Sequence, residues 1–425
     1  MTYEKTIDYL YNAAPAFEKV GAGAYKEGLA NTKALDKHFG YPHRSYKTIH
    51  IAGTNGKGSC SHTIAAILQS AGYKVGLYTS PHLIDFRERI RVNGKCISKE
   101  RVIDFVDKER DFYQPLQPSF FELTTALAFK YFEEETVDIA VIEVGLGGRL
   151  DCTNIISPLL SVITNISLDH TQFLGETLEK IAGEKAGIIK KNTPCVVGEY
   201  NDETKSVFEN KANEMNAPLI FAQDNIISSD INFELKGNYQ AKNKNTILNA
   251  IAYLSKVLTI NDDNIINGFD KVCELTGLMG RWQKLSEHPL IICDTGHNLA
   301  GWEYLSKQIK ETSETLKHDY SLNSQPSITR IIFGMVDDKD VVSVINLLPK
   351  DAEYYFCQAS TKRAIESEKI ASIAETVGLN GKFFSSVEIA YRNAIENANN
   401  NDFIFVGGSS YIVADLLTYL ANLDS

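Results

Sequence analysis

The sequence has little of what marks nucleic-acid-binding, secreted or membrane proteins. Acidic residues outnumber lysine and arginine by 54 to 43, the net charge is −11, and no basic run offsets it, so we expect no nucleic-acid partner. The seven cysteines are scattered without any Cys-x-x-Cys spacing, which predicts reduced thiols and a cytoplasmic location. No apolar run approaches the ~20 residues of a membrane span, and the N-terminus lacks a signal-peptide pattern.

What the chain does contain is typical of a globular protein with more than one domain. Its 425 residues are 44% hydrophobic and 23% charged, which supplies a core but exceeds the size of one ordinary domain. The polar stretch Lys284–Pro289 ends in proline and is the best candidate for a linker. We therefore predict domains at 1–286 and 290–425, without solenoid repeats, and we expect a monomer.

A glycine-rich turn near the start of the first α/β series predicts a phosphate-binding loop. An apolar strand pattern ends at Ala52, and a helical pattern of apolar residues begins beyond Cys60. The residues between them that would hold phosphate are Thr54, Asn55, Gly56, Lys57, Gly58 and Ser59. Glycine amides and a helix N-terminus favour an oxyanion, and Lys57 can reach a β- or γ-phosphate. The glycine spacing is shorter than in the usual P-loop, and the alternative is a plain strand-to-helix turn.

Polar side chains at the ends of two further predicted strands suggest a metal site. Glu143 ends the most apolar strand of the chain, over 137–144, and the strand over 159–166 leads into Asp169 and His170. Ligands of open α/β sheets bind beyond the carboxyl ends of the strands, so Glu143 is placed to hold Mg²⁺ near the phosphate loop. A salt-bridged edge carboxylate is the alternative. The glycines after Glu143 do not have the Gly-x-Gly-x-x-Gly spacing of a nicotinamide-cofactor site.

Lys185 falls on an apolar helix face. Leu178, Ile181, Ala182, Lys185 and Ile189 follow a spacing of i, i+3, i+4, i+7 and i+11. A lysine on such a face either extends to the margin of the face or is held there for chemistry, and its position leaves both interpretations open.

The remaining patterns define the fold class. Residues 1–44 suggest an N-terminal cap, and the Asn-Gly turn within 88–95 predicts a hairpin. Strands and helices alternate again after residue 290, interrupted by a polar surface insertion at 312–325. We therefore predict an α/β protein in which a P-loop-containing parallel-sheet ATPase domain precedes a smaller, Rossmann-like, doubly wound α/β domain.

Several motifs together resemble the folylpolyglutamate synthase and dihydrofolate synthase family of the Mur ligase superfamily, over nearly the whole chain. These motifs are Gly53–Ser59, Thr79–Leu83, Glu88–Gly94, Glu143–Asp151, Leu168–Thr171, Glu184–Ile188, Gly280–Arg281, Asp294–Asn298 and Gly334–Asp340.

The resemblance implies a role for each matching residue. It implies ATP phosphates on the loop, Mg²⁺ on Ser80, Glu143 and His170, and a carbamylated lysine at Lys185. It further implies that Asn243, Arg281 and Asp294 contact ATP from the domain interface, with Arg281 on the γ-phosphate. A pterin pocket would be lined by residues near Ser119, Phe120, Phe121 and Glu122 and by Leu150, Asp151 and Cys152. His297 is either near the incoming glutamate or a satisfied loop histidine.

The implied reaction is amide-bond formation between L-glutamate and the carboxylate of dihydropteroate or a reduced folate. ATP would first convert that carboxylate into an acyl phosphate, and positioning and charge neutralisation would supply most of the catalysis. A cell-wall amino-acid ligase would share the loop and the metal site, but only about forty residues precede the loop strand here. A nucleotide-binding switch without turnover would leave Lys185 and the Thr79–Leu83 motif unexplained.

Overall fold

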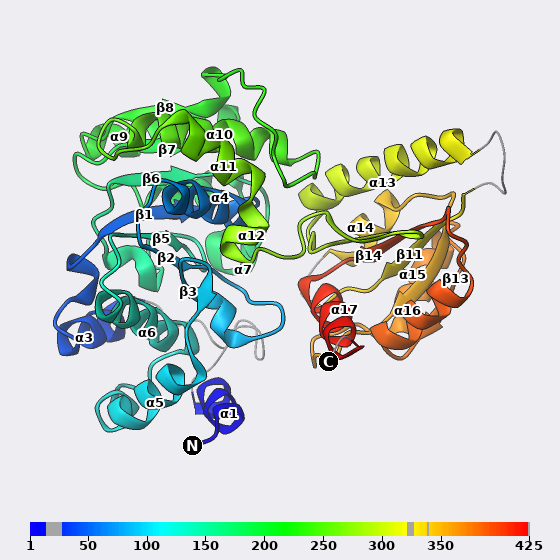
Figure 1. Cartoon of the computed structure of the whole chain (residues 1–425), viewed down its shortest axis with the longest axis horizontal. Coiled ribbons are helices and arrows are strands. Elements are labelled where there is room, and N and C mark those ends of the chain that lie inside the picture. Colours follow the sequence, from blue (N-terminus) through cyan, green and yellow to red (C-terminus); the bar gives the residue numbers. More distant parts are fainter. Residues whose placement is uncertain (14–27, 321–326, 338–339, 424–425) are drawn as a thin grey trace. The chain divides into compact units, whose positions relative to one another are not determined.

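The computed structural model describes residues 1–13, 28–320, 327–337 and 340–423, which form two units. Met1–Glu234 and Gln240–Leu278 pack as unit 1, whereas Leu235–Tyr239 and Met279–Ser425 pack as unit 2 (Figure 1). Part of the predicted N-terminal cap, residues 14–27, and part of the Gly334–Asp340 motif lie outside the described residues. Within the described residues, no helix is long and apolar enough to span a membrane, and all seven cysteines are free thiols, as predicted.

Unit 1 is built on a sheet with the strand order β4-β3-β2-β5-β1-β6-β7-β8. Its strands are β1 (Lys47–Ala52), β2 (Val75–Tyr78), β3 (Ile90–Val92), β4 (Lys95–Cys96), β5 (Ile139–Glu143), β6 (Leu160–Ile163), β7 (Cys195–Val197) and β8 (Leu219–Phe221). Six neighbouring strands of the sheet, β2, β5, β1, β6, β7 and β8, pair in parallel. The predicted hairpin forms β3 and β4, which pair antiparallel at one edge. Asn93 and Gly94 have φ of 45° and 74°, which is the left-handed geometry of a two-residue hairpin turn.

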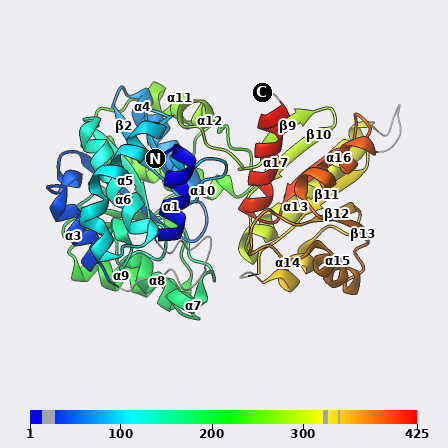
Figure 2. The ribbon, with the colours of Figure 1, turned by 90° about the horizontal axis from the view of Figure 1, so that it is seen from below.

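Helices cover both faces of this sheet (Figures 1 and 2). They are α1 (Tyr3–Ala13), α3 (Ala30–His38), α4 (Lys57–Ser70), α5 (Lys99–Tyr113), α6 (Phe120–Glu134), α7 (Thr171–Leu174), α8 (Leu178–Ala186), α9 (Asp202–Glu214), α10 (Gln240–Leu254), α11 (Asp262–Asp270) and α12 (Val272–Thr276). The 3₁₀ turns are η2 (Pro42–Arg44), η3 (Phe86–Arg89), η4 (Gln114–Leu116), η5 (Cys152–Ile155) and η6 (Ala222–Asp224). Helix α4 packs on β1, β2 and β5 and is surrounded by α10, α11 and α12, so the helix that follows the glycine turn is central.

Side chains alternate along the strands between two buried layers. Ala140 and Ile142 of β5 join Tyr78 and the apolar side of α6 in one core. Ala52 and Ile163 pack with Ala182 and other residues of α8 in a second core. Strands buried on both faces explain the near-continuous apolar runs in the sequence.

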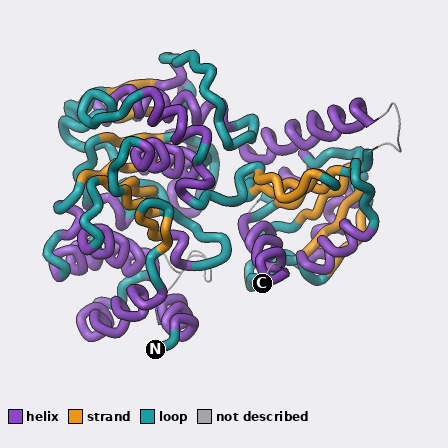
Figure 3. The backbone as a smooth tube through the Cα atoms, in the orientation of Figure 1, coloured by secondary structure: helices purple, strands orange, loops and turns teal. Residues whose placement is uncertain are grey.

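Unit 2 has a second sheet, with the order β13-β12-β11-β14-β10-β9. Its strands are β9 (Gln283–Glu287), β10 (Leu290–Asp294), β11 (Thr329–Phe333), β12 (Glu353–Cys357), β13 (Gly381–Phe384) and β14 (Phe403–Gly407), and its helices are α13 (Leu299–Tyr320), α14 (Val341–Leu347), α15 (Ser367–Thr376), α16 (Val387–Glu396) and α17 (Ser410–Leu423). Helices α13, α14 and α15 share one core with the sheet, while α16 and α17 pack on its strands from the other side. Figure 3 shows these strands as a layer among helices. The predicted doubly wound α/β unit is confirmed.

The predicted linker at 284–289 is wrong. Residues 283–287 form β9, which pairs antiparallel with β10, and the division between the units falls after Leu278. Because β9 is the edge strand of its sheet, it carries exposed polar residues, and polar composition ending in proline also describes a linker. The predicted insertion at 312–325 is also partly wrong, because α13 continues to Tyr320.

Candidate active site

The predicted ligand-bearing strand ends of unit 1 lie at one edge of the sheet. Strands β2, β5, β1 and β6 are successive neighbours and run parallel. Glu143 is the last residue of β5, Gly53 follows β1, Ser80 lies two residues beyond β2, and His170 follows β6 before α7. The strand-end positions expected for the glycine loop and for Glu143 are therefore confirmed, whereas β6 ends earlier than predicted and His170 caps α7. The roles of these residues as ligands stay predictions.

The glycine turn connects β1 to α4, as predicted, and its two first glycines are sterically required. Gly53 has φ of 147°, and a Cβ there would lie 1.8 Å from Thr164 Oγ1; Gly56 has φ of 84°, and a Cβ there would lie 2.3 Å from Asn243 Oδ1. Both positions combine a left-handed backbone with a close neighbour, so another residue would strain the loop. Lys57 begins α4 directly after the N-cap Gly56.

Two of the loop amides are engaged by the chain itself. The N–H of Thr54 donates to Asn165 O at 3.0 Å, and the N–H of Asn55 donates to Asn165 Oδ1 at 2.9 Å. The amides that can face a phosphate are thus those at the N-terminus of α4, where the first turn of a helix has no internal acceptors. The phosphate contacts of the predicted loop residues stay predictions. Asn165, which pairs with these two amides, was missed because a polar residue near a strand end has no distinctive spacing.

The start of α10 also lies against the loop. Gln240 Nε2 donates to Ser59 Oγ at 3.0 Å, and Asn243 Nδ2 donates to Gln240 Oε1 at 2.8 Å. Asn243 therefore belongs to unit 1 and sits beside Gly56. Gln240 is a further contact of the loop that no sequence pattern indicated.

Two lysines meet at one carbonyl oxygen. Lys57 Nζ donates to Gly53 O at 3.0 Å and to Thr54 O at 3.1 Å, and Lys185 Nζ donates to the same Gly53 O at 2.9 Å. Lys185 is 4% exposed on α8, beside buried Ile181, so its predicted place on the apolar face is confirmed. Burial, and then the nearby Lys57 cation, lowers the pKa of Lys185 to about 7, and the neutral amine becomes accessible near neutral pH.

The side chains predicted to hold a divalent cation have suitable chemistry. Glu143 is buried at the end of β5, and Ser80 and His170 follow neighbouring strands. Among the described residues, no three His, Cys, Asp or Glu side chains are grouped closely enough to hold a metal by themselves. Mg²⁺ is commonly bound by one or two carboxylates, with water and substrate phosphates completing its shell. A single carboxylate beside a phosphate loop fits that ion.

The predicted pterin-pocket residues at 119–122 form the start of α6. Ser119 Oγ accepts from Glu122 N at 3.2 Å, and Glu122 Oε2 accepts from Ser119 N at 2.6 Å, so the two residues close a capping box. Phe120 stacks on Tyr11 of α1 with ring centroids 4.7 Å apart. A Cβ on Gly145 would lie 2.3 Å from the Phe121 ring.

The second predicted group, Leu150 to Cys152, adjoins the same glycine turn. Asp151 Oδ2 accepts from the N–H groups of Gly145 at 3.1 Å and Leu146 at 2.9 Å. Asp151 thus anchors the turn that follows Glu143. The structure brings both predicted groups together around Gly145.

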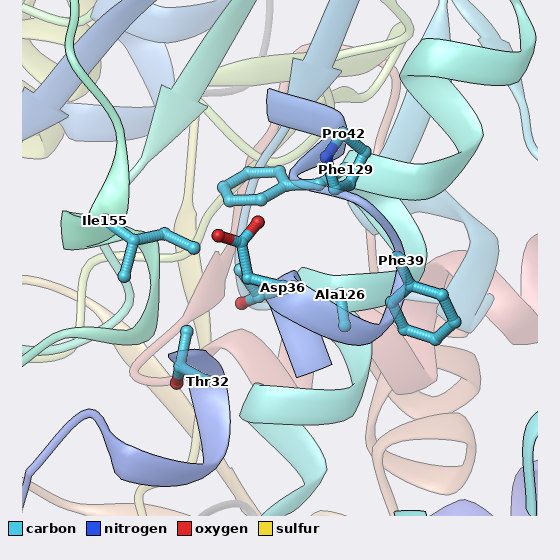
Figure 4. A pocket seen from close by; sticks show the side chains of 8 residues that line it. Thr32, Asp36, Phe39, Pro42, Ala126, Phe129 and Ile155 are labelled. Atoms are coloured by element: carbon cyan, nitrogen blue, oxygen red, sulfur yellow. The ribbon is translucent and has the colours of Figure 1, made fainter. Parts of the chain in front are cut away.

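A small cavity lies between α3 and α6 (Figure 4). It is lined by Thr32, Asp36, Phe39, Pro42, Thr125, Ala126, Phe129 and Ile155 and measures about 10 Å³, which is room for about one water. Asp36 on its wall pairs with His43 at 2.8 Å. It is too small for a pterin ring and contains none of the predicted substrate residues.

In unit 2, Asp294 is held by its own chain. It is 2% exposed; its Oδ2 accepts from Tyr239 Oη and Trp282 N, both at 2.7 Å, and its Oδ1 accepts from Gly296 N at 2.8 Å. Burial raises the pKa of the Asp294 carboxyl, and Arg281 and these donors oppose the shift. Tyr239, which precedes α10, was missed because nothing in the sequence relates it to Asp294.

Arg281, which precedes β9, contacts the loop after Asp294 that contains His297. Arg281 Nη1 donates to Gly280 O at 3.1 Å and to Thr295 Oγ1. His297 Nδ1 lies 3.1 Å from Thr295 O, and because a carbonyl only accepts, Nδ1 carries the proton. The structure brings these three predicted residues together within unit 2, and their contacts with ligands stay predictions.

Comparison with known proteins agrees with this division of the chain. Residues 51–267 match the Mur ligase middle domain, and residues 280–410 match the Mur ligase, glutamate ligase domain. The fold and the loop chemistry therefore define an ATP-dependent ligase of the Mur type.

Relatives narrow the class further. The Dihydrofolate synthase/folylpolyglutamate synthase of Bacillus subtilis is 34% identical over 92% of this chain and 94% of its own. The structure of Escherichia coli FolC in complex with DHPP and ADP has a TM-score of 0.84 at 28% identity, covering 100% and 99% of the two chains. A Yersinia pestis bifunctional folylpolyglutamate synthase/dihydrofolate synthase complexed with AMPPNP and Mn has a TM-score of 0.83 at 28% identity, covering 99% and 98%. The chain belongs to the dihydrofolate synthase/folylpolyglutamate synthase family.

Proposed function

We propose that this chain joins L-glutamate to the carboxylate of dihydropteroate or a reduced folate, through an acyl phosphate formed with ATP. The observation that carries the proposal is the edge of the unit 1 sheet, where Lys57 and Lys185 bond the glycine loop and buried Glu143 ends the neighbouring strand β5. The ADP and AMPPNP complexes of similar proteins support a nucleotide there.

Lys57 and the N-terminus of α4 neutralise the charge of the transferring phosphoryl group. A carboxylate oxygen of the substrate attacks the γ-phosphorus, ADP leaves, and the amino group of glutamate then displaces phosphate from the acyl carbon. Little covalent work falls to the protein, so positive charge fixed in place is the main contribution of these groups. Arg281 and Asp294 of unit 2 contact ATP in this proposal, Arg281 on the γ-phosphate, and His297 lies near the incoming glutamate.

Ser80, Glu143 and His170 would hold the divalent cation, and the proposed ion is Mg²⁺. Bound there, it would supply positive charge to the phosphoryl oxygens. The Mn in a similar protein supports a divalent site. Glu143 contributes the anionic ligand, Ser80 a hydroxyl and His170 an imidazole, each from a different strand end.

Lys185 acts in the proposal as a carbamate. Its buried amine can add CO₂ once neutral, with loss of one proton from nitrogen to solvent, and the product is an anion on a long stem. An ammonium can neither react with CO₂ nor bind a cation, so the lowered pKa of Lys185 supports this role.

The pterin pocket is proposed at Ser119–Glu122 and Leu150–Cys152. The two groups meet at Gly145, which supports this position of the pocket. DHPP is the ligand of one similar protein. Phe121, which is half-buried, offers an aromatic face for a planar ring, whereas buried Phe120 stacks on Tyr11 and would support the pocket by packing. Cys152 and Leu150 flank the anchored Asp151.

One experiment tests this function and separates its two forms. The purified chain receives ATP, Mg²⁺ and L-glutamate with either dihydropteroate or tetrahydrofolate, and mass spectrometry looks for a product heavier by one glutamate. Product from both acceptors establishes a bifunctional enzyme, and product from tetrahydrofolate alone establishes chain extension only. ATP hydrolysis without product from either acceptor would contradict the proposal, and ligation to a UDP-linked acceptor instead would show a cell-wall ligase.

A further inference from the structure

A histidine lies in the middle of the central strand of unit 1, where the neighbouring positions are apolar. His50 of β1 is 0% exposed and pairs in register with Ile142 of β5, a residue of the core beneath α6. Its Nε2 lies 2.8 Å from Thr153 Oγ1 of η5. Burial, with a smaller contribution from Lys190, lowers the pKa of His50 to about 3, so the imidazole is neutral at physiological pH.

Thr153 continues the contact to Asp151. The Thr153 N–H donates to Asp151 Oδ1 at 2.9 Å, and the Thr153 hydroxyl contacts the same oxygen. With the Gly145 and Leu146 amides on Oδ2, both carboxylate oxygens have two partners each, which fills their capacity. His50, Thr153 and Asp151 thus form one buried chain of polar groups that ends on the turn after Glu143.

The direction of each hydrogen bond follows from the free-energy cost of burying an unpaired N–H group. If Asp151 is ionised, the Thr153 hydroxyl donates to it, and His50 donates Nε2–H to Thr153, which leaves Nδ1 as a lone pair. The opposite direction would place a proton on Nδ1, which has no acceptor among the described residues. An unpaired buried N–H costs more than an unpaired lone pair, so the chain runs from His50 through Thr153 to Asp151.

We propose that His50 and Thr153 are positioning residues that fix the Asp151 carboxylate and, through it, the Gly145–Cys152 turn that lines the pterin pocket. This inference rests on the proposed function, because the pocket itself is part of that proposal. It adds a link from the strand that precedes the phosphate loop to the substrate side of the enzyme. His50 and Thr153 themselves touch no substrate.

The alternative is that the hydrogen-bonded groups of His50, Thr153 and Asp151 only fill the core. Two apolar residues of similar shape would then serve equally well, since replacing both partners of a buried hydrogen bond can be nearly neutral for stability. A relay that positions Asp151 predicts something different. The double replacement removes both partners of the His50–Thr153 bond but takes one donor from the buried Asp151 carboxylate, so the turn loses its fixed geometry even where the fold is kept.

The test uses the double variant His50→Leu/Thr153→Val, in which no unpaired imidazole N–H remains. Thr153→Ser is the matched control, because it keeps the hydroxyl. Thermal unfolding is recorded, and the dissociation constants for dihydropteroate, for tetrahydrofolate and for ATP are measured by fluorescence titration. We expect the double variant to stay folded, to melt no lower than single Thr153→Val, which also leaves the His50 N–H unpaired, and to bind the pterin ligand at least fivefold more weakly than the parent, with ATP binding within twofold. Thr153→Ser should match the parent in all measurements.

Several outcomes would overturn the inference. One is a folded double variant with parental affinity for the pterin ligand, and another is an equal loss of pterin and ATP affinity, which would show general loosening of β1. If the double variant does not fold, single Thr153→Val decides the matter, since equal pterin affinity in the Val and Ser variants contradicts the relay. A parent that binds the pterin ligand but forms no product would refute the proposed function while leaving this binding test intact.

Discussion

The two units have similar parallel sheets but use charge differently at the carboxyl ends of their strands. In unit 1, Lys57 and Lys185 share the uncharged Gly53 carbonyl. In unit 2, Asp294 accepts hydrogen bonds from Tyr239, Trp282 and Gly296. One carbonyl is a modest partner for two lysine side chains, whereas three donors satisfy a carboxylate almost completely.

The difference shows that the same fold can leave a charged side chain available to a ligand or satisfy it with hydrogen bonds inside the protein. Lys57 of unit 1 gains little from its two carbonyl partners, and an arriving phosphate is a stronger partner for this cation. The carboxylate of unit 2 fixes its own loop, so its removal should damage structure before chemistry. Variants can test this contrast, from the largest expected effect to the smallest.

The largest effects should come from Lys57→Ala and Glu143→Gln. Each removes a charge at the transferring phosphoryl group, so turnover should fall at least ~10²-fold, while the melting temperature stays close to that of the parent. Steady-state ligation at saturating Mg²⁺ and circular dichroism measure the two quantities. Lys307→Ala, at a lysine that is 74% exposed in unit 2, is the control and should leave both unchanged. Near-parental turnover by either variant would contradict the proposal that these side chains stabilise charge at the transferring phosphoryl group.

Lys185 should lose activity in a way that charge alone does not explain. Lys185→Arg keeps a cation but cannot form a carbamate, so it should be nearly inactive. Lys185→Ala should regain part of its activity when acetate is added, because a small carboxylate can replace the carbamate. Initial rates with and without acetate provide the measurement. An Arg variant as active as the parent would show that the side chain is structural.

The burial of Lys185 also predicts a pH dependence of stability. Its pKa is about 7 in the folded chain, against 10.5 for a lysine in water, so between these pH values the unfolded chain binds a proton that the folded chain does not. Stability should therefore rise with pH across this window, and the cost of burial should be greatest below pH 7. Without CO₂, Lys185→Met should be more stable than the parent at pH 7. That advantage should shrink by at most about 1.4 kcal/mol per pH unit up to pH 9. An advantage independent of pH would contradict a depressed pKa.

In unit 2 we expect substitutions to lower stability first, whereas in unit 1 they lower turnover first. Asp294→Ala leaves buried donors without an acceptor and should lower the free energy of unfolding by about 2–3 kcal/mol, whereas Tyr239→Phe removes one hydrogen bond and should cost about 1 kcal/mol. Differential scanning calorimetry of the full chain measures both. If Asp294→Ala kept parental stability, its three hydrogen bonds would not be holding the loop, and the contrast with unit 1 would fail.

The smallest effect concerns two helix caps. Ser119 caps α6 and Ser98 caps α5, each accepting a backbone N–H at 3.2 Å. Alanine at either position should cost about 1 kcal/mol of stability. Only Ser119→Ala should also weaken pterin binding, because Ser119 lies in the proposed pocket. Equal pterin affinity in the two variants would place the pocket elsewhere.

Local sequence patterns were sufficient wherever short-range chemistry decides the structure. Glycines that need a left-handed backbone located the loop at Gly53 and Gly56, and helical spacing placed Lys185 on its apolar face. Parallel-strand composition placed Glu143 at a strand end. The resemblance to a ligase family, based on these motifs, was confirmed by the comparisons.

Other features could be decided only by the tertiary structure, because they join residues far apart in the chain. Asn165 accepts hydrogen bonds from two loop amides, and Tyr239 donates one to Asp294. His50 is connected to Asp151 through Thr153. Each partner is an ordinary polar residue without distinctive spacing, so no pattern marks the pair. The strand β9 was mistaken for a linker for the same reason, since pairing with β10 determines its structure. Apart from β9, the sequence by itself determined the main elements and the residues with reactive chemistry. Packing decided which of those residues meet, because hydrogen bonds between distant segments exist only once the sheets have assembled.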